Sequence, residues 1–236
     1  MRLSTHSLVV LAFLGLTACS VAATDDDSGG EPAADESALT IDGFVEPTAE
    51  DEAHMVERFP QLDPDRVVPR DLLYRAVAFW ELNRERVTNR RYLSVIDFSR
   101  HSSKKRLFIV EMDTGRVDAH VVAHGSGSDP DHTGYARRFS NVSGSNASSV
   151  GFYLTGETYQ GNHGLSLRLD GVSDTNSNAR SRAVVMHSAD YVEEGSAKQG
   201  RSWGCPAIPN NMREAIIRRL KGGSVLYIER AGRGDP

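Results

Sequence analysis

The sequence is poor in cysteine and in long apolar runs, and each shortage narrows what the protein can be. Its 236 residues include two cysteines, Cys19 and Cys205, so one disulfide at most could form. The apolar run Leu8–Leu16 has nine residues, far short of the roughly 20 that a membrane-spanning helix needs. A basic stripe with interleaved aromatic residues is also lacking, and we therefore expect no nucleic-acid partner.

Charges of both signs are present but unevenly distributed. Up to Glu57 there are twelve acidic residues and one basic residue, Arg2, which leaves 20 acidic and 26 basic residues for 58–236. This basic excess either forms an ordinary solvated surface or attracts an anionic partner such as a cell-wall polymer. A hydrophobic content of 39% and a charged content of 25% are normal for a globular protein and exclude disorder throughout.

The first nineteen residues are typical of a targeting segment. Arg2 provides the positive start, the apolar run follows, and Leu16-Thr17-Ala18-Cys19 resembles a bacterial lipobox, in which the cysteine is lipidated. The alternative is an ordinary secretory peptide with a chance cysteine. Because Ser20 rather than Asp follows, the pattern is similar to that of lipoproteins of the outer membrane. We predict a lipoprotein signal peptide over 1–19, with lipidation of Cys19 and a protein facing the periplasm.

The composition predicts three further segments. Residues 20–57 are small, acidic or proline and glycine, and cannot bury enough surface to offset their ordering entropy, so we expect a flexible tether. Residues 58–91 are expected to form a helical segment packed on the domain. Pro69 suits a first helical turn, and residues at helical spacing predict an amphipathic helix over 69–88, namely Leu73, Val77, Trp80, Arg84 and Val87.

Residues 92–236 are expected to form the main domain, because the pattern changes there to the alternation typical of strands. Strands are predicted over 92–98, 106–113, 116–124, 151–155, 165–170, 183–187 and 224–229. A short helix over 210–221 is indicated by Met212, Ile216 and Leu220. The fold class is therefore mainly β, a sandwich or barrel with an N-terminal amphipathic helix and one short C-terminal helix.

Cys205 and His187 are the candidate chemical pair. A thiolate forms near neutral pH only beside a base or a positive group, and a histidine at the end of a strand can be that base. The loop 188–199 is long enough to bring Cys205 back to His187. If Cys19 carries lipid, Cys205 has no disulfide partner in an oxidising compartment. Either full burial of the thiol or a chemical role would then explain why a lone cysteine is present.

The residues next to Cys205 suit acyl chemistry. Gly204 lets the backbone approach a substrate closely. The amides of Gly204 and Cys205 can point at one spot and hold an oxyanion. Pro206 has no N–H and stiffens the turn.

These residues resemble a known signature. His187, followed after fourteen residues by Ser202-Trp203-Gly204-Cys205, is similar to that of YkuD-type L,D-transpeptidases, a histidine followed after 14–17 residues by Ser/Thr-His-Gly-Cys. Ser149-Val150-Gly151-Phe152 resembles their Thr-Pro-x-Gly-x-Phe strand. Four further runs resemble the murein L,D-transpeptidase catalytic domain family: Ala123-His124-Gly125-Ser126-Gly127-Ser128, Phe139-Ser140-Asn141, Gly161-Asn162-His163-Gly164-Leu165-Ser166-Leu167 and Gly200-Arg201-Ser202-Trp203-Gly204-Cys205-Pro206-Ala207. The resemblance covers about residues 92–230.

The resemblance implies a YkuD-like fold and a role for each matching residue. Cys205 would be the nucleophile and His187 its base, with the carbonyl of Ser188 orienting the imidazole. The amides around Trp203, Gly204 and Cys205 would form the oxyanion hole. No cofactor or metal is implied.

The implied reaction is acyl transfer on a peptidoglycan stem tetrapeptide, in which a terminal D-amino acid leaves and an amine takes the acyl group. If water is the acceptor, the protein is an L,D-carboxypeptidase. A third possibility is a non-catalytic, lipid-tethered module that binds the cell wall. We expect a monomer.

Two positions depart from the usual signature, where Trp203 replaces a histidine and Ala207 replaces an asparagine or arginine. Both fit the divergent branch but leave the substrate and acceptor open. Candidate substrate contacts are Arg201, Ser202, Trp203, Tyr159, His124 and His163. For the last two the alternative is a polar turn or surface residue, and Tyr159 and Arg201 are equally compatible with a structural role. A metal site from His120, His124, His163 and Cys205 has no ligand-spacing signature.

Overall fold

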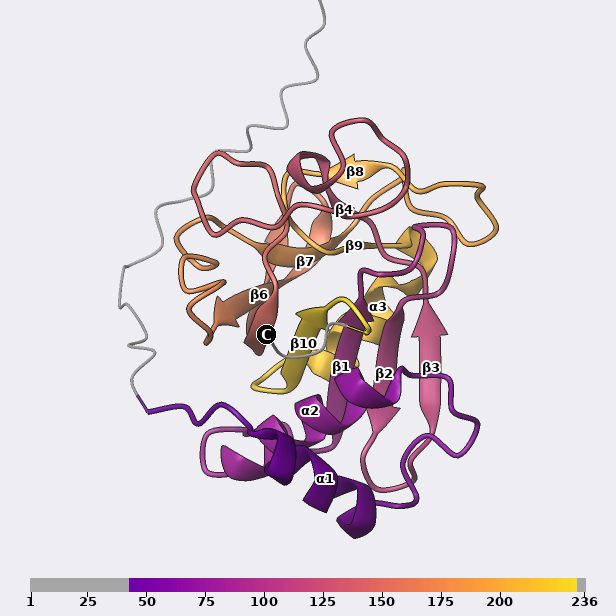
Figure 1. The fold of residues 1–236 in the computed structure, drawn as a ribbon. Helices are drawn as coiled ribbons and strands as arrows, with labels where there is room; N and C mark the ends of the chain where they lie inside the picture. Colours follow the sequence, from indigo (N-terminus) through magenta and orange to yellow (C-terminus); the bar gives the residue numbers. More distant parts are fainter. Residues whose placement is uncertain (1–42, 233–236) are drawn as a thin grey trace, which may run out of the picture. The chain divides into compact units, whose positions relative to one another are not determined.

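The computed structural model describes residues 43–232, which form three α-helices and ten strands (Figure 1). The helices are α1 (Ala49–Arg58), α2 (Arg70–Leu82) and α3 (Arg213–Leu220). The strands are β1 (Tyr92–Asp97), β2 (Leu107–Glu111), β3 (Val117–His120), β4 (His124–Gly125), β5 (Gly151–Gly161), β6 (Gly164–Gly171), β7 (Val185–Ser188), β8 (Arg201–Ser202), β9 (Ala207–Ile208) and β10 (Val225–Glu229). The predicted mainly β class, with an N-terminal helix and one short C-terminal helix, is confirmed, and the structure has α1 as a second N-terminal helix.

Eight of the strands form one sheet in the order β3-β2-β1-β10-β5-β6-β7-β9, and β4 and β8 form a separate two-stranded sheet. The pairs β1–β10 and β7–β9 are parallel, as is β4–β8. The other neighbouring strands of the large sheet run antiparallel. β10 follows all the other described strands in the chain, yet it lies near the middle of the sheet between β1 and β5.

Both faces of the sheet are buried, because successive side chains of a strand point to opposite faces. Val225 and Tyr227 of β10 join a cluster with α1 and α2, whereas Leu226 and Ile228 join a second cluster with α3. In the first cluster the ring of Phe152 stacks between those of Phe79 and Tyr227 at 4.0 and 4.3 Å. The two layers explain why apolar residues such as Val225 to Ile228 follow one another in β10 without alternation.

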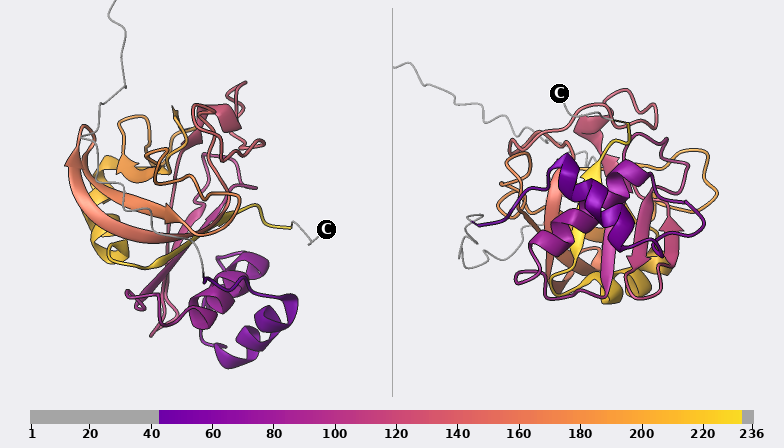
Figure 2. Two further views of the ribbon diagram at one scale, coloured as in Figure 1. Left: turned by 90° about the vertical axis from the view of Figure 1, so that its left-hand side faces the viewer. Right: turned by 60° about the horizontal axis from the view of Figure 1, so that its bottom comes forward.

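Helix α1 corrects the prediction that the flexible tether runs as far as residue 57. Thr48 and Asp51 form a capping box at its start. Met55 is buried against α2, and Glu52 pairs with Arg75 of α2 at 2.7 Å. The acidic residues that made this stretch resemble a tether therefore cap and anchor a helix, which Figure 2 shows beside α2. Helix α2 is shorter than the predicted 69–88, since it ends at Leu82.

Strand β5 extends well beyond the strand predicted over 151–155, whereas β6 agrees with the strand predicted over 165–170 to within one residue at each end. The register of the β5–β6 hairpin shifts between Thr155 and Thr158, a bulge that bends the long ribbon seen in Figure 2. Gly161 and Gly164 pair at the end of the hairpin, so His163 lies on its turn.

The signal peptide, Cys19 and the first part of the predicted tether lie outside the described residues. Within 43–232, no helix is long and apolar enough to cross a membrane.

Candidate active site

The parallel pairing of β7 and β9 brings His187 and Cys205 to the same place in the fold. His187 pairs with Ala207 across these two strands, and Cys205 lies two residues before Ala207. The amide of Val185 donates to the Cys205 Sγ at 3.5 Å, and the carbonyl oxygen of Ala183 lies 3.7 Å from the same sulfur. Val185 and His187 lie on the same face of β7, two residues or about 7 Å apart. The thiol is half-buried and accessible from solvent.

His187 is held by its own strand. The side chain is 5% exposed, and its Nδ1 lies 3.1 Å from the carbonyl oxygen of Ser188. A carbonyl only accepts hydrogen bonds, so Nδ1 carries the proton and Nε2 is the basic nitrogen. The contact that the family resemblance implies between these two residues is therefore present.

The turn that carries Cys205 is closed by Ser202. Its Oγ donates to the carbonyl oxygen of Cys205 at 2.6 Å and accepts the amide of Gly204 at 3.2 Å. Ser202 is buried, and its hydroxyl is used inside the turn, which differs from the predicted substrate contact. The Gly204 amide is likewise engaged by Ser202. The amides of Trp203 and Cys205 remain the predicted donors of an oxyanion hole.

Gly204 is required by both its conformation and its surroundings. Its φ is +127°, a value that residues with a side chain rarely adopt, and a Cβ would lie 2.9 Å from the carbonyl oxygen of Ala147. Gly125 of β4 is equally crowded, because a Cβ there would lie 2.7 Å from the Cα of Gly204. The lack of side chains at Gly125 and Gly204 therefore allows β4, the segment around Ala147 and the Cys205 turn to lie in direct backbone contact.

Arg182 holds the segment 140–149 against this turn, a role that the sequence did not reveal. Its guanidinium donates to the carbonyl oxygens of Ser140 and Ala147 at 2.8 and 2.7 Å. Ser148 completes the attachment, since its Oγ donates to the carbonyl oxygen of Gly204 and accepts the amide of Gly125, both at 3.0 Å. The only available signal was the position of Arg182 just before the strand of His187.

His163 lies against the candidate base. Its ring stacks on that of His187, with 4.3 Å between centroids and 28° between planes. Arg213 of α3 lies behind the pair and donates to the carbonyl oxygen of His163 at 3.3 Å. The structure therefore brings His163, predicted as a substrate contact, directly to the His187 ring.

His124 is a buried structural residue, which corrects its prediction as a rim contact. Only 1% of it is exposed, because β4 runs through the interior. The Nη2 of Arg106 donates to Nδ1 of His124 at 2.7 Å, and Nε2 lies 3.4 Å from Oδ2 of Asp129. Burial and the nearby Arg106 lower the pKa of His124 to about 3, so it stays neutral.

The partners of His124 are held just as firmly. Burial lowers the pKa of Arg106 to about 9, which still leaves the guanidinium charged at neutral pH. Burial would raise the pKa of Asp129, but hydrogen bonds from Thr133 and Gly134 hold it at about 2. The neutral imidazole thus lies between a fixed cation and a fixed anion.

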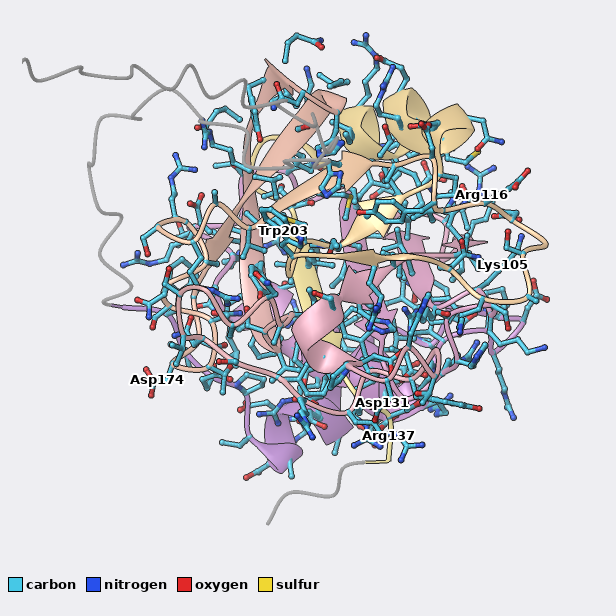
Figure 3. The ribbon with its side chains drawn as sticks, turned by 90° about the horizontal axis from the view of Figure 1, so that it is seen from above. Lys105, Arg116, Asp131, Arg137, Asp174 and Trp203 are labelled. Atoms are coloured by element: carbon cyan, nitrogen blue, oxygen red, sulfur yellow. The ribbon has the colours of Figure 1, made fainter. Side chains whose placement is uncertain are left out.

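Other predicted contacts lie around this framework. The guanidinium of Arg201 donates to the carbonyl oxygens of Asp129 and Pro130, which favours its structural interpretation. The ring of Tyr159 on β5 is covered by Arg168 at 4.6 Å. Trp203, by contrast, lies two residues before the nucleophile and is 50% exposed (labelled in Figure 3). It is well placed to contact a bound substrate.

The histidines considered for a metal site do not share one. His120 lies 3.7 Å from Glu194, and burial lowers its pKa. His124 contacts Arg106 and Asp129, and His163 contacts His187. In the part of the chain that the structure describes, no group of three or more His, Cys, Asp or Glu side chains is arranged to hold a metal ion.

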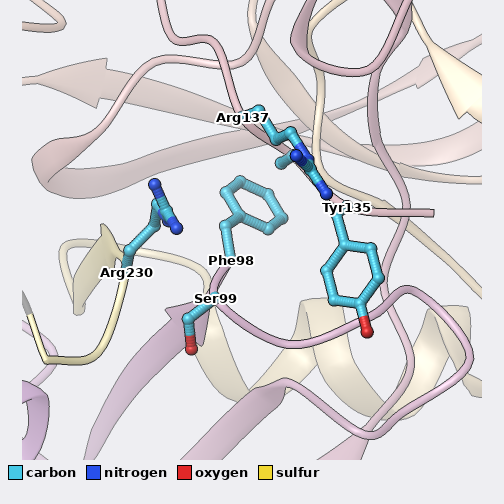
Figure 4. A pocket seen from close by; sticks show the side chains of 6 residues that line it. Phe98, Ser99, Tyr135, Arg137 and Arg230 are labelled. Atoms are coloured by element: carbon cyan, nitrogen blue, oxygen red, sulfur yellow. The ribbon is translucent and has the colours of Figure 1, made fainter. Parts of the chain in front are cut away.

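A shallow pocket of about 400 Å³ lies apart from the Cys205 turn (Figure 4). Its lining comes from the end of β1, from 135–137 and from the segment after β10, namely Phe98, Ser99, Tyr135, Ala136, Arg137 and Arg230. No lining residue belongs to 183–188 or to 201–206, so this pocket is not the candidate active site.

Comparison with known proteins identifies the domain. The family model described as the L,D-transpeptidase catalytic domain matches residues 66–228. No curated protein matches the chain. Among solved structures, the L,D-transpeptidase from Mycobacterium smegmatis is 12% identical with a TM-score of 0.37, over 59% of this chain and 58% of that one.

Two further solved structures are similar. The helical cell shape determining protein Pgp2 from Campylobacter jejuni is 14% identical with a TM-score of 0.39, over 60% of this chain and 49% of that one. L,D-transpeptidase 1 from Mycobacterium tuberculosis is 12% identical with a TM-score of 0.31, over 58% of this chain and 60% of that one. The chain matches less than two thirds of the length of each of the three.

Proposed function

Because the chain belongs to the L,D-transpeptidase catalytic domain family, we propose that it modifies peptidoglycan as a cysteine acyltransferase. One observation carries this proposal. The imidazole of His187, oriented through Nδ1 by the Ser188 carbonyl at 3.1 Å, stands on the strand whose Val185 amide donates to the sulfur of Cys205. A nucleophile beside a base that a third group orients is the arrangement of covalent catalysis.

The first half of the reaction transfers an acyl group to the enzyme. Nε2 of His187 takes the proton of Cys205, and the thiolate attacks the carbonyl carbon between the L-centre of the third stem residue and the terminal D-amino acid. A C–S bond forms and the carbonyl oxygen becomes an oxyanion, held by the amides of Trp203 and Cys205. The oxyanion collapses, the C–N bond breaks, and His187 returns its proton to the leaving amine.

The second half releases the acyl group. An acceptor amine attacks the thioester carbonyl and gives its proton to His187, a C–N bond forms, and the C–S bond breaks to regenerate the thiolate. With a stem-peptide amine the product is a crosslink. With water the product is a free tripeptide, and the protein is then an L,D-carboxypeptidase.

The proposal extends to location. The lipobox at Leu16-Thr17-Ala18-Cys19 would attach the protein to the outer membrane, and residues 20–42 would let the domain reach peptidoglycan from the periplasmic side. The basic excess of residues 58–236 suits an anionic polymer.

The decisive experiment uses the full chain with Cys19→Ala, in which Cys205 is the only cysteine. The protein is incubated with sacculi, and the muropeptides are separated and weighed. We expect new crosslinks with loss of the terminal D-residue, and none from a matched Cys205→Ala variant. Tripeptides without crosslinks would identify the carboxypeptidase. Unchanged muropeptides, or equal products from Cys205→Ala, would refute the proposal and favour a non-catalytic wall-binding module.

A covalent probe gives a second measurement. A β-lactam of the carbapenem class should add its mass to the intact protein by acylating Cys205. The adduct should be missing from Cys205→Ala.

A further inference from the structure

The turn between β5 and β6 brings a second imidazole to the candidate base. His163 stacks on His187 with 4.3 Å between ring centroids and 28° between planes. At its edge, the Nδ1 of His187 donates to the carbonyl oxygen of Ser188 at 3.1 Å. The predicted base is thus held at one edge by a carbonyl and on one face by an aromatic ring.

The turn itself is fixed in place. The carbonyl oxygen of His163 accepts the hydroxyl of Ser188 at 3.4 Å and Nη1 of Arg213 at 3.3 Å. Arg213 also lies 3.4 Å from the same hydroxyl, which joins β7, α3 and the turn. Gly164 has a φ of +76°, and a Cβ there would lie 2.5 Å from Nη1 of Arg213. The His163 ring is therefore delivered to His187 by a tightly packed turn.

Stacking adds a restraint to the hydrogen bond at Nδ1. Rotation of the His187 ring would move Nε2 relative to the sulfur of Cys205. A second ring at 4.3 Å blocks such rotation on one side and excludes water from that face. Its π face also favours the imidazolium that forms when His187 takes the proton.

We propose that His163 is a positioning residue for His187, acting through the stacked ring to keep Nε2 directed at Cys205. This inference rests on the proposed function, since it assumes that His187 is the base of Cys205. His163 forms no bond to the substrate in this role. Two groups that can carry charge contact the β5–β6 turn. Arg213 of α3 donates to the carbonyl oxygen of His163, and His187 of β7 stacks on the His163 ring.

The test measures the rate at which iodoacetamide alkylates Cys205 in the full chain with Cys19→Ala, from pH 6 to 9. His163→Leu removes the aromatic ring, and His163→Phe keeps a stacked ring without a titrating nitrogen. His101→Leu is the matched control, because His101 also forms an aromatic pair, with Tyr135 at 4.9 Å, and neither residue belongs to 183–188 or 201–206. His187→Ala reports on the base, and melting temperatures confirm folding.

We expect His163→Leu to slow alkylation near pH 7 by about 3- to 10-fold, the range that one aromatic pair supplies. His163→Phe should stay within about twofold of the parent, and His101→Leu should have no effect. The inference is overturned if His163→Leu matches the parent, or if His163→Phe loses as much as His163→Leu. If His187→Ala alkylates at the parent rate, the base assignment of the proposed function fails instead.

Discussion

Acidification should destabilise this fold through His124, the buried imidazole of β4. His124 accepts a hydrogen bond from Arg106 at 2.7 Å, which only the neutral ring can do. β4 pairs with β8, where Gly125 lies opposite Ser202 of the Cys205 turn. Protonation of His124 would therefore disturb the support of the candidate site as well as the core.

The magnitude follows from the pKa. Burial and Arg106 lower the pKa of His124 from 6.5 to about 3 in the folded protein. Between these values the unfolded chain binds a proton that the folded chain does not. The free energy of unfolding therefore has its full value above pH 6.5 and decreases as the pH falls below it. At pH 5, one and a half pH units below the unfolded value, the loss is about 2 kcal/mol.

The assay is urea unfolding at pH 7.5 and pH 5.0, with the parent compared with His124→Gln. Glutamine can accept from Arg106 and donate to Asp129 but does not titrate. Other groups, such as His120, titrate in both proteins and cancel in the comparison. The parent should lose about 2 kcal/mol more than the variant between the two pH values. Equal losses would show that His124 does not titrate on unfolding, and the reasoning would be refuted.

Three further outcomes are expected. Deletion of residues 1–42 should leave the melting temperature, measured by calorimetry, within about 2 °C of the parent. Deletion of 1–57 should lower it by at least about 5 °C, because this deletion also removes buried Met55. Gly204→Ala should cut product formation from sacculi at least about tenfold, since its φ of +127° and the contact with Ala147 forbid a side chain; unchanged turnover would contradict this. Cys19→Ala should release the protein from washed membranes in fractionation, and retention would contradict the lipobox.

Much of the sheet could be predicted because its pattern is local. β1, β2, β6 and β10 are runs of apolar or alternating residues bounded by turns, and the structure has strands at those positions. The sequence pattern predicts only the first part of β5, because Glu157 and Gln160 interrupt the apolar pattern where the strand leaves the core. The spacing of His187 and Cys205 identified the candidate pair before their elements were known.

The errors share a physical cause, since each involves partners distant in sequence. The acidic composition of α1 gave no sign that Glu52 would meet Arg75. His124 resembles a loop residue beside a glycine until Arg106 and Asp129 are placed around it. The stack of His163 on His187 depends on the length of the β5–β6 hairpin. The sequence of that hairpin predicts its length only in part.

The position of β10 also means that the large sheet can be completed only when residues 225–229 are available. Leu93 of β1 pairs with Val225 of β10, and Leu154 of β5 pairs with the same residue on the other side. Without β10, β1 and β5 each have an unpaired edge, and both hydrophobic clusters lack the side chains that β10 contributes. Such non-local pairing makes folding slow. We propose that this chain is exported. Slow folding would keep it unfolded until β10 completes the sheet, and an unfolded chain can pass through a translocation channel.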